Sequence, residues 1–162
     1  MTVKKLLRYN IRLCHSVVTA YLADLSNEEL LDAPASGANA VAWQLGHVLV
    51  SNEEMLRALG GSPPPLPPDF VSTHSRSAAR SSTADQFAAK SEYLAYFAAQ
   101  HEYALQFLEA YPENLLGEPG PEKTRAYLPT NAAVFLMLGT HEMMHAGQIA
   151  VLRRKLSKSI VI

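Results

Sequence analysis

The residues His141-Glu142-Met143-Met144-His145-Ala146-Gly147-Gln148 lie within a long apolar stretch near the C-terminus of the chain. Histidines four residues apart share one face of a helix, so the imidazoles of His141 and His145 can converge on one point. Imidazole is a common ligand of divalent metals, and a helix would hold the two rings in register. The spacing alone leaves two interpretations open: a shared metal ion, or two buried rings that hydrogen-bond to the backbone or to Gln148.

The periodicity around this motif recurs along the chain. Apolar residues follow each other at helical steps in residues 6–25, 39–59, 83–111 and 131–156. Residues 132–138 are apolar on every side of the expected helix, which predicts that they are buried. No segment shows the alternation that is typical of a β-strand. The sequence therefore predicts an all-α protein, and four long helices in 162 residues are typical of a four-helix bundle.

Capping signals indicate where the helices begin. Asn39 is an N-cap residue type for the second long helix, and Thr130 or Asn131 serves the fourth. The stretches Ser26-Asn27-Glu28-Glu29 and Thr83-Ala84-Asp85-Gln86 both have the pattern of a capping box. We expect the first box to open a short helical turn and the second to open the third long helix.

Residues 60–82 differ in composition from the rest of the chain. The run Gly60-Gly61-Ser62-Pro63-Pro64-Pro65-Leu66-Pro67-Pro68 and the serine-rich stretch after it are not expected to sustain a helix. Neither side alone has enough helix for a stable domain, so we expect a long proline-rich surface crossover between the second and third helices. Residues 1–162 then form a single domain. The proline run is interpreted as an extended spacer, with an SH3-type ligand as the alternative.

The composition is that of a globular protein. Hydrophobic residues make up 48% of the chain, charged residues 18%, and the formal net charge is −1. This balance has no basic excess that would favour nucleic acid. No run of about 18 apolar residues predicts a membrane span. The lone Cys14 fits a reducing compartment, so we expect a cytoplasmic protein that binds neither nucleic acid nor membrane.

His47 favours the metal interpretation of the histidine pair. It lies midway along the second expected helix, on the face that carries Trp43 and Val50. In an antiparallel bundle the midpoints of neighbouring helices lie at similar height, so His47 can reach His141 and His145. Three imidazoles leave one coordination position open, which is typical of a catalytic rather than a structural metal site.

The motif also matches the H-E-x-x-H signature of zinc proteases. Those enzymes need a third protein ligand, usually downstream, but no His, Asp or Glu follows His145. Glu142 would also point about 100° away from His141 around the helix. We therefore interpret Glu142 as a carboxylate that faces solvent or the surroundings of the metal ligands, and we reject the protease interpretation.

The remaining histidines are interpreted separately. His101 shares the inner seam of the third helix and could be a fourth ligand, but a hydrogen-bonded histidine at the edge of the core is the more common case, so we leave it out of the site. His15 and His74 are interpreted as helix-flank and loop residues without chemical partners. Cys14 is interpreted as a buried apolar residue rather than a thiolate ligand.

These motifs resemble a known family. Leu45-Gly46-His47 in the second helix, followed by His141-x-x-x-His145-x-Gly147-Gln148 in the last, resembles the DinB-like superfamily (DinB/YfiT-type) over nearly the whole chain. The resemblance implies a four-helix bundle with a divalent metal (zinc, nickel, iron or manganese) held by three histidines, here His47, His141 and His145. It also implies a homodimer and, for several members, transfer or isomerisation reactions that use a low-molecular-weight thiol.

The leading functional hypothesis is accordingly a metal-dependent transferase or isomerase that acts on a small electrophile through an activated thiol. Two alternatives stay open: a metal-dependent hydrolase that uses water alone, and a non-enzymatic dimeric binding or stress-response module with a vestigial metal site. Aromatic residues outside the inner seam of the third helix offer a surface for a second copy; they are Tyr93, Tyr96, Tyr103 and Phe107.

Overall fold

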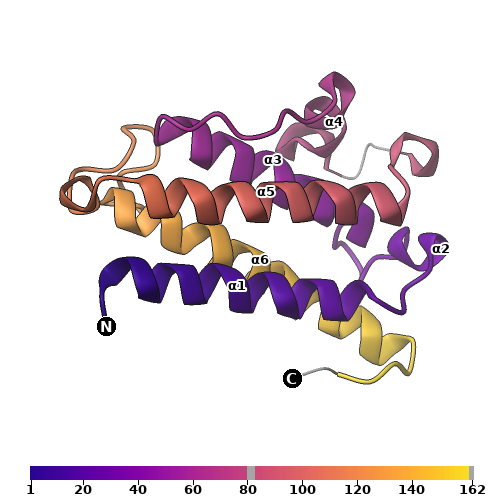
Figure 1. Ribbon diagram of the computed structural model, residues 1–162. Coiled ribbons are helices and arrows are strands. Elements are labelled where there is room, and N and C mark those ends of the chain that lie inside the picture. The colour runs from indigo at the N-terminus through magenta and orange to yellow at the C-terminus, as the bar shows by residue number, and fades with distance from the viewer. Residues whose placement is uncertain (80–82, 161–162) are drawn as a thin grey trace.

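The computed structural model describes residues 1–79 and 83–160, and this part of the chain is helical, without a β-strand. An isolated bridge between Pro119 and Thr130 is the sole extended pairing among the described residues. The all-α prediction is confirmed (Figure 1). In chain order the elements are α1 (Val3–Leu22), α2 (Asn27–Leu30), α3 (Val41–Ala58), α4 (Pro68–His74), the 3-10 turns η1 (Arg76–Ala78) and η2 (Ala84–Gln86), α5 (Lys90–Ala110), η3 (Glu113–Leu115) and α6 (Asn131–Lys155).

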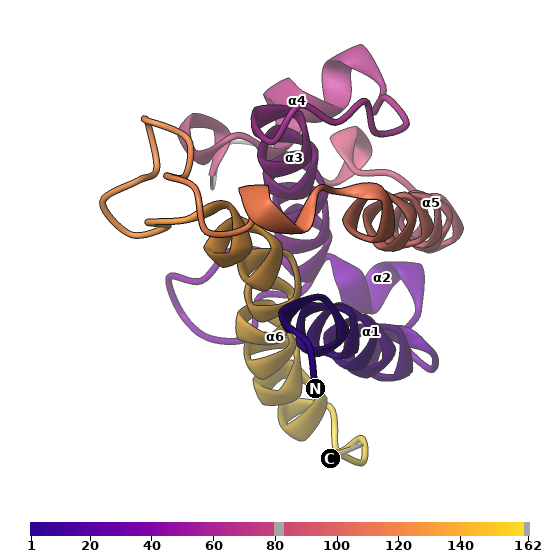
Figure 2. The same cartoon turned by 60° about the vertical axis from the view of Figure 1, so that its left-hand side comes forward.

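Helices α1 and α6 lie side by side and run in the same direction (Figure 1 and Figure 2). Toward the start of both helices, Asn10 Nδ2 donates a hydrogen bond to the backbone carbonyl of Leu136 at 3.0 Å. Toward their ends, Arg153 Nη1 donates to the carbonyl of Tyr21 at 2.7 Å and its guanidinium pairs with Asp24. These contacts join the first and the last long helix of the chain.

Helices α3 and α5 also run in a common direction, opposite to α1 and α6 (Figure 1). Gln100 Nε2 donates to the carbonyl of Leu49 at 3.1 Å, and the Tyr103 hydroxyl accepts from the Ser62 backbone N–H, just beyond the end of α3, at 2.6 Å. Because α5 starts at the same end as α3, the chain between them has to return along the length of the helices. This topology is the physical reason for the long segment between Leu59 and Ala89.

The connecting segment is partly helical, so the expectation that residues 60–82 hold no helix is wrong. Pro68 occupies the first turn of α4, where its fixed φ suits a helix and its missing N–H is not needed. The proline run therefore serves as a helix start as well as a spacer. Residues 80–82, at the end of the serine-rich stretch, lie outside the described part of the chain.

Helix α4 docks its last residue, His74, onto α3 beside the metal-ligand candidate His47. The His74 ring is 1% exposed and lies 2.8 Å from both the Phe70 carbonyl and the Tyr93 hydroxyl. A Cβ on Gly46 would overlap this ring, so the glycine is needed for close approach. His74 thus anchors the connecting segment in the interior, and the prediction that it is a loop residue without partners is wrong.

Two predicted helix starts are wrong. Helix α3 begins after Ala40, and Asn39 provides no side-chain cap. The box at Thr83 opens only η2, while α5 begins at Lys90, where the Glu92 carboxylate accepts the backbone N–H of Ala89 at 2.9 Å. Both positions have the residue types of a cap, but α3 starts one residue later than predicted, and the turn at Thr83 ends before the long helix α5 begins.

Two other predicted starts are confirmed. Ser26 and Glu29 form a reciprocal capping box at α2, and the Thr130 hydroxyl accepts the N–H of Ala133 at the start of α6. Each such cap contributes about 1 kcal/mol to stability.

The core fills the space between the four long helices. Each fully buried aliphatic or aromatic side chain contributes about 1.5–3 kcal/mol. Residues 132–138 are less completely buried than predicted, because Leu136 is 42% exposed although Phe135 and Leu138 are inside. The core side chains with 2% exposure or less include Leu22, Leu49, Phe97 and Ile149.

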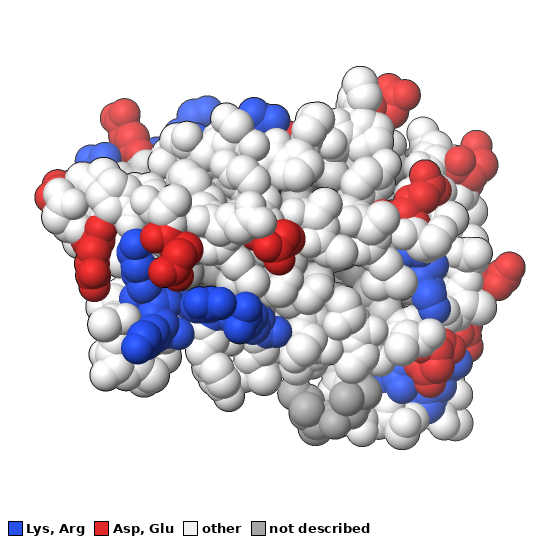
Figure 3. All heavy atoms as spheres, viewed as in Figure 1, with Lys and Arg blue, Asp and Glu red and all other residues white. Residues whose placement is uncertain are grey.

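Acidic and basic side chains lie next to one another on the face shown in Figure 3, rather than in separate patches of one sign. One such pair joins α1 to α5, with 3.7 Å between Arg8 Nη1 and Glu109 Oε2. Within the described ranges, no helix is both long enough and apolar enough to cross a bilayer.

Candidate metal centre

Three histidines from two antiparallel helices meet at one place. His47 lies in the middle of α3, and His141 and His145 occupy consecutive turns of α6. One potential ligand nitrogen from each ring lies within 4.8 Å of the other two. Among the described residues, no other three His, Cys, Asp or Glu side chains come together in this way. The structure thus brings together the three residues that the sequence singled out.

The three rings approach each other from different directions. The centroids of His47 and His141 are 5.3 Å apart with the rings at 89°, and those of His141 and His145 are 4.9 Å apart at 70°. Rings at such angles do not stack, and their nitrogen atoms can point at a common centre. On its other side His47 stacks on Trp43, at 4.9 Å and 8°, which restricts rotation of the imidazole.

Gln44 orients one of the three rings. Its Nε2 donates to the Asn39 carbonyl at 2.9 Å, so its Oε1 faces His145 Nδ1 at 3.0 Å as an acceptor. This network assigns the hydrogen of His145 to Nδ1 and leaves Nε2 with a free lone pair. Histidines that bind a metal usually donate their other ring N–H to an oxygen acceptor, and Gln44 Oε1 is such an acceptor. The predicted alternative partner, Gln148, is exposed instead.

Burial keeps the three imidazoles neutral. Desolvation, together with the neighbouring His47, lowers the pKa of His141 to about 4. Desolvation and the nearby His141 and His47 lower the pKa of His145 to about 3. The pKa of His47 is also lowered, chiefly by burial and then by the positive charge of Arg76, while the backbone of His74 acts in the opposite direction. Neutral rings present the lone pairs that a metal ion requires.

Comparisons with known proteins identify the family of the chain. The family model of the DinB superfamily matches residues 10–149, a span that includes all three histidines. The chain belongs to the DinB superfamily. A solved structure described as the conserved protein of a locus from Enterococcus faecalis has a similar fold, with a TM-score of 0.72, 20% sequence identity, and coverage of 98% of this chain and 99% of that one. At this identity the likeness shows the fold alone. No curated protein matches the chain.

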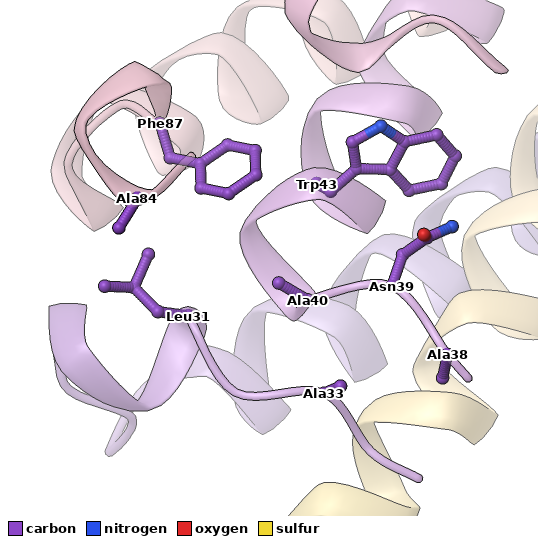
Figure 4. A pocket seen from close by; sticks show the side chains of 8 residues that line it. All are labelled: Leu31, Ala33, Ala38, Asn39, Ala40, Trp43, Ala84 and Phe87. Carbon is purple, nitrogen blue, oxygen red and sulfur yellow. The ribbon is translucent and has the colours of Figure 1, made fainter. Parts of the chain in front are cut away.

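In this DinB-superfamily chain a cavity of about 260 Å³ has Trp43 in its wall, the residue whose ring stacks on His47, while none of the three histidines lines it. Figure 4 shows Phe87 and Leu31 on one side, Trp43 on the other and Ala40 between them. The lining is mostly apolar, and Trp43 Nε1 is a buried donor that has no hydrogen-bond partner among the described residues. Trp43 therefore has one face against His47 and also borders a cavity of small-molecule size.

The position of Glu142 corrects an expectation. The residue is 6% exposed, so it does not face solvent, and its Oε1 accepts a hydrogen bond from Asn52 Nδ2 at 3.2 Å rather than supporting a metal ligand. Desolvation raises the pKa of the Glu142 carboxyl to about 8. Since the carboxylate is bound to Asn52 in the interior, it is not aimed at the three histidines as a protease base would be. The structure therefore agrees with rejecting the protease interpretation.

His15 and His101 lie outside the three-histidine group. Their rings stack at 4.0 Å and 8°, and His15 Nδ1 is 3.9 Å from Glu142 Oε2. The prediction that His15 has no chemical neighbours is wrong, whereas leaving His101 out of the site agrees with the geometry. Cys14 is buried, as expected, and also donates weakly to Asn10 Oδ1 at 3.6 Å.

Two residues of the site were missed from the sequence: Gln44 and Trp43. A usable signal existed for Gln44, because residues 41–50 are otherwise apolar except for His47. A buried polar residue one turn from a candidate ligand needs a partner, and the candidate ligand set supplies it.

Proposed function

We propose that His47, His141 and His145 bind one divalent metal ion, and that the protein is a metal-dependent enzyme. The reaction class we assign is a thiol-dependent transfer or isomerisation on a small electrophile. The observation that carries the proposal is the convergence of three neutral imidazoles whose nitrogens lie within 4.8 Å of one another. Three protein ligands leave a coordination position open for a reactant.

The chain's own residues fit the binding of a metal. The lone pair of His145 Nε2 is set by the contact of Nδ1 with Gln44. Trp43 covers one face of His47 and restricts access of water from that side. A bound divalent ion would supply the positive charge that lowers the pKa of a thiol or of water at the open position. Imidazole ligands suit zinc, nickel and iron, whereas manganese prefers oxygen ligands.

We place the body of the small-molecule substrate in the cavity beside Trp43. Its volume of about 260 Å³ is at the lower end for ligand sites and suits a compact, mostly apolar molecule. The indole ring of Trp43 would then lie between the bound substrate and His47.

The function is tested by an activity screen of the metal-loaded protein. Small electrophiles are offered with bacillithiol, mycothiol or glutathione, each with and without a chelator. The expected result is turnover that requires both thiol and metal and that His145→Ala abolishes. Metal-dependent turnover without any thiol would replace the transferase by the hydrolase alternative.

The non-enzymatic alternative predicts a different outcome. If the site is vestigial, alanine at His47, His141 or His145 leaves the protein's cellular role intact. Complementation of a deletion strain with each alanine variant separates the two cases: loss of the phenotype rescue supports the enzyme, and full rescue contradicts it.

We further propose that the fold is a four-helix bundle whose crossover spans residues 59–89, and that the protein is a cytoplasmic homodimer. The aromatic residues of α5 do not support dimerisation, because Tyr93 is buried and the other three pack against the core. Large apolar side chains are exposed elsewhere, on α1 and α6. These exposed side chains include Leu6, Tyr9, Leu13, Leu136, Met144 and Val151. Light scattering should give twice the mass of one chain, and a monomer would contradict the proposal of a homodimer.

A further inference from the structure

A second polar group lies in the interior, away from the three histidines. All four long helices contribute to it, although the surrounding core is apolar. Seven buried side-chain nitrogen or oxygen atoms lack a hydrogen-bond partner among the described residues, and five of them belong to this group. These five atoms are His15 Nδ1, Asn52 Oδ1, Gln100 Oε1, His101 Nε2 and Glu142 Oε2.

Four of these residues line one small cavity. It is bounded by Asn52 of α3, Gln100 and His101 of α5 and Glu142 of α6, with apolar side chains closing the remaining sides. Its volume is about 10 Å³ on the scale of a water-sized probe. That is enough for about one water molecule, and too small for an organic ligand.

The hydrogen bonds of the two amides define what the cavity can accept. Asn52 Nδ2 donates to Glu142 Oε1 at 3.2 Å, and Gln100 Nε2 donates to the Leu49 carbonyl at 3.1 Å. Each amide nitrogen is therefore assigned, and the oxygens Asn52 Oδ1 and Gln100 Oε1 remain as acceptors. A guest in this cavity has to donate hydrogen bonds. Buried acceptors are nearly always satisfied by protein or by ordered water.

We infer that this cavity binds one water molecule, which donates hydrogen bonds to Asn52 Oδ1 and Gln100 Oε1. Both hydrogens of the water are then used, so its oxygen can only accept, either from a protonated His101 Nε2 or from a protonated Glu142 Oε2. A water with two to four polar partners is the usual occupant of a polar cavity of this size. The water would connect α3, α5 and α6 through polar atoms that have no direct hydrogen bond among the described residues.

The geometry favours water over an ion pair or a metal. His15 Nδ1 and Glu142 Oε2 are 3.9 Å apart, too far for a direct hydrogen bond. His15, His101 and Glu142 do not bring three ligand atoms within 4.8 Å of one another, as a metal site requires. The inference is independent of the proposed function, because none of the three candidate metal ligands lines the cavity.

The test is a high-resolution crystal structure of the full chain. The expected result is one density peak within hydrogen-bonding distance of both Asn52 Oδ1 and Gln100 Oε1. An empty cavity would overturn the inference. A peak with anomalous signal and ligand distances of about 2.0–2.3 Å would overturn it as well, in favour of a metal ion.

A solution measurement keeps the inference testable if a variant fails to fold. In wild-type protein, a long-lived water should give nuclear Overhauser contacts to the side-chain amides of Asn52 and Gln100. Gln100→Leu should remove these contacts at Asn52. The matched control is Gln106→Leu, at an exposed glutamine of the same helix, which should preserve them. Absence of any long-lived water contact in the wild type contradicts the inference.

Discussion

Two histidine groups lie on neighbouring faces of α6, and their geometry differs in an instructive way. His47, His141 and His145 cross at steep angles, and their nitrogens converge. His15 and His101 stack in parallel, so their nitrogens do not share a centre. Each group is at least partly buried, and burial lowers the pKa of the imidazoles in both, so burial does not distinguish them. The difference teaches that the relative orientation of the rings, more than their number or burial, marks a candidate metal site.

The largest expected effect is the loss of a metal ligand. His145→Ala should weaken zinc binding by about 100-fold or more, since removing a ligand costs more than the 10–100-fold typical of a supporting residue. His101→Ala, in the stacked pair, should leave the affinity within about threefold of the wild type. Isothermal titration with zinc measures both. Equal losses of zinc affinity in the two variants would show that the stacked pair contributes to metal binding as much as the convergent group does.

The next effect concerns the support of His145. Gln44→Ala removes the acceptor at 3.0 Å from His145 Nδ1 and should lower zinc affinity by about 10–100-fold. Gln148→Ala, an exposed glutamine of α6, is the control and should have no effect. A Gln44→Ala protein with wild-type affinity would show that His145 is oriented by packing alone.

The interior group should respond in stability rather than in metal affinity. Asn52→Ala leaves Glu142 Oε1 buried without its donor, and we expect a loss of about 1–3 kcal/mol in the free energy of unfolding. The neighbouring Ser51→Ala, on the same helix, should change it by less than about 0.5 kcal/mol. Urea unfolding measures both variants. A large change in zinc affinity in Asn52→Ala would mean that the two groups are coupled.

The smallest effect is a pH dependence that arises from His15. Desolvation and the neighbouring His101 lower its pKa from 6.5 to about 4 in the folded protein. Between these two pKa values the His15 ring binds more protons in the unfolded chain than in the folded protein. Its contribution to the free energy of unfolding is therefore fully present above pH 6.5 and is lost as the pH falls toward 4. His15→Gln should reduce the slope of unfolding free energy against pH in this window, by at most about 1.4 kcal/mol per pH unit.

The measurement is urea unfolding of metal-free wild type and variant on both sides of pH 6.5. Identical slopes for the two proteins would show that the His15 ring takes up protons equally well in the folded and unfolded states.

The sequence predicted the parts of the fold that depend on local periodicity. The four long helical segments follow from apolar residues at helical spacing, and His141 with His145 follows from the i,i+4 rule. His47 is predicted to lie near this pair because the midpoints of neighbouring antiparallel helices lie at similar height. Helices α3 and α6 are antiparallel, and the three histidines do come together.

The parts that depend on tertiary packing were harder to predict. Glu142 points away from the three histidines, as predicted, but its contact with Asn52 of α3 was not predicted. Helix α6 packs against both α1 and α3, and the sequence alone does not show which residues of α6 each neighbour covers. Proline interrupts the interior of a helix but suits its first turn, so the sequence alone does not show which of the two roles Pro68 has.

The central claim, that three histidines form a metal site, is tested most directly by metal analysis of the purified protein. Elemental analysis combined with X-ray absorption spectroscopy gives both the metal content and the ligand set. The account predicts about one divalent ion per chain with three imidazole nitrogens, lost in His47→Ala, His141→Ala and His145→Ala and retained in His101→Ala. A metal-free wild type whose stability is unchanged by zinc and by chelators would contradict it.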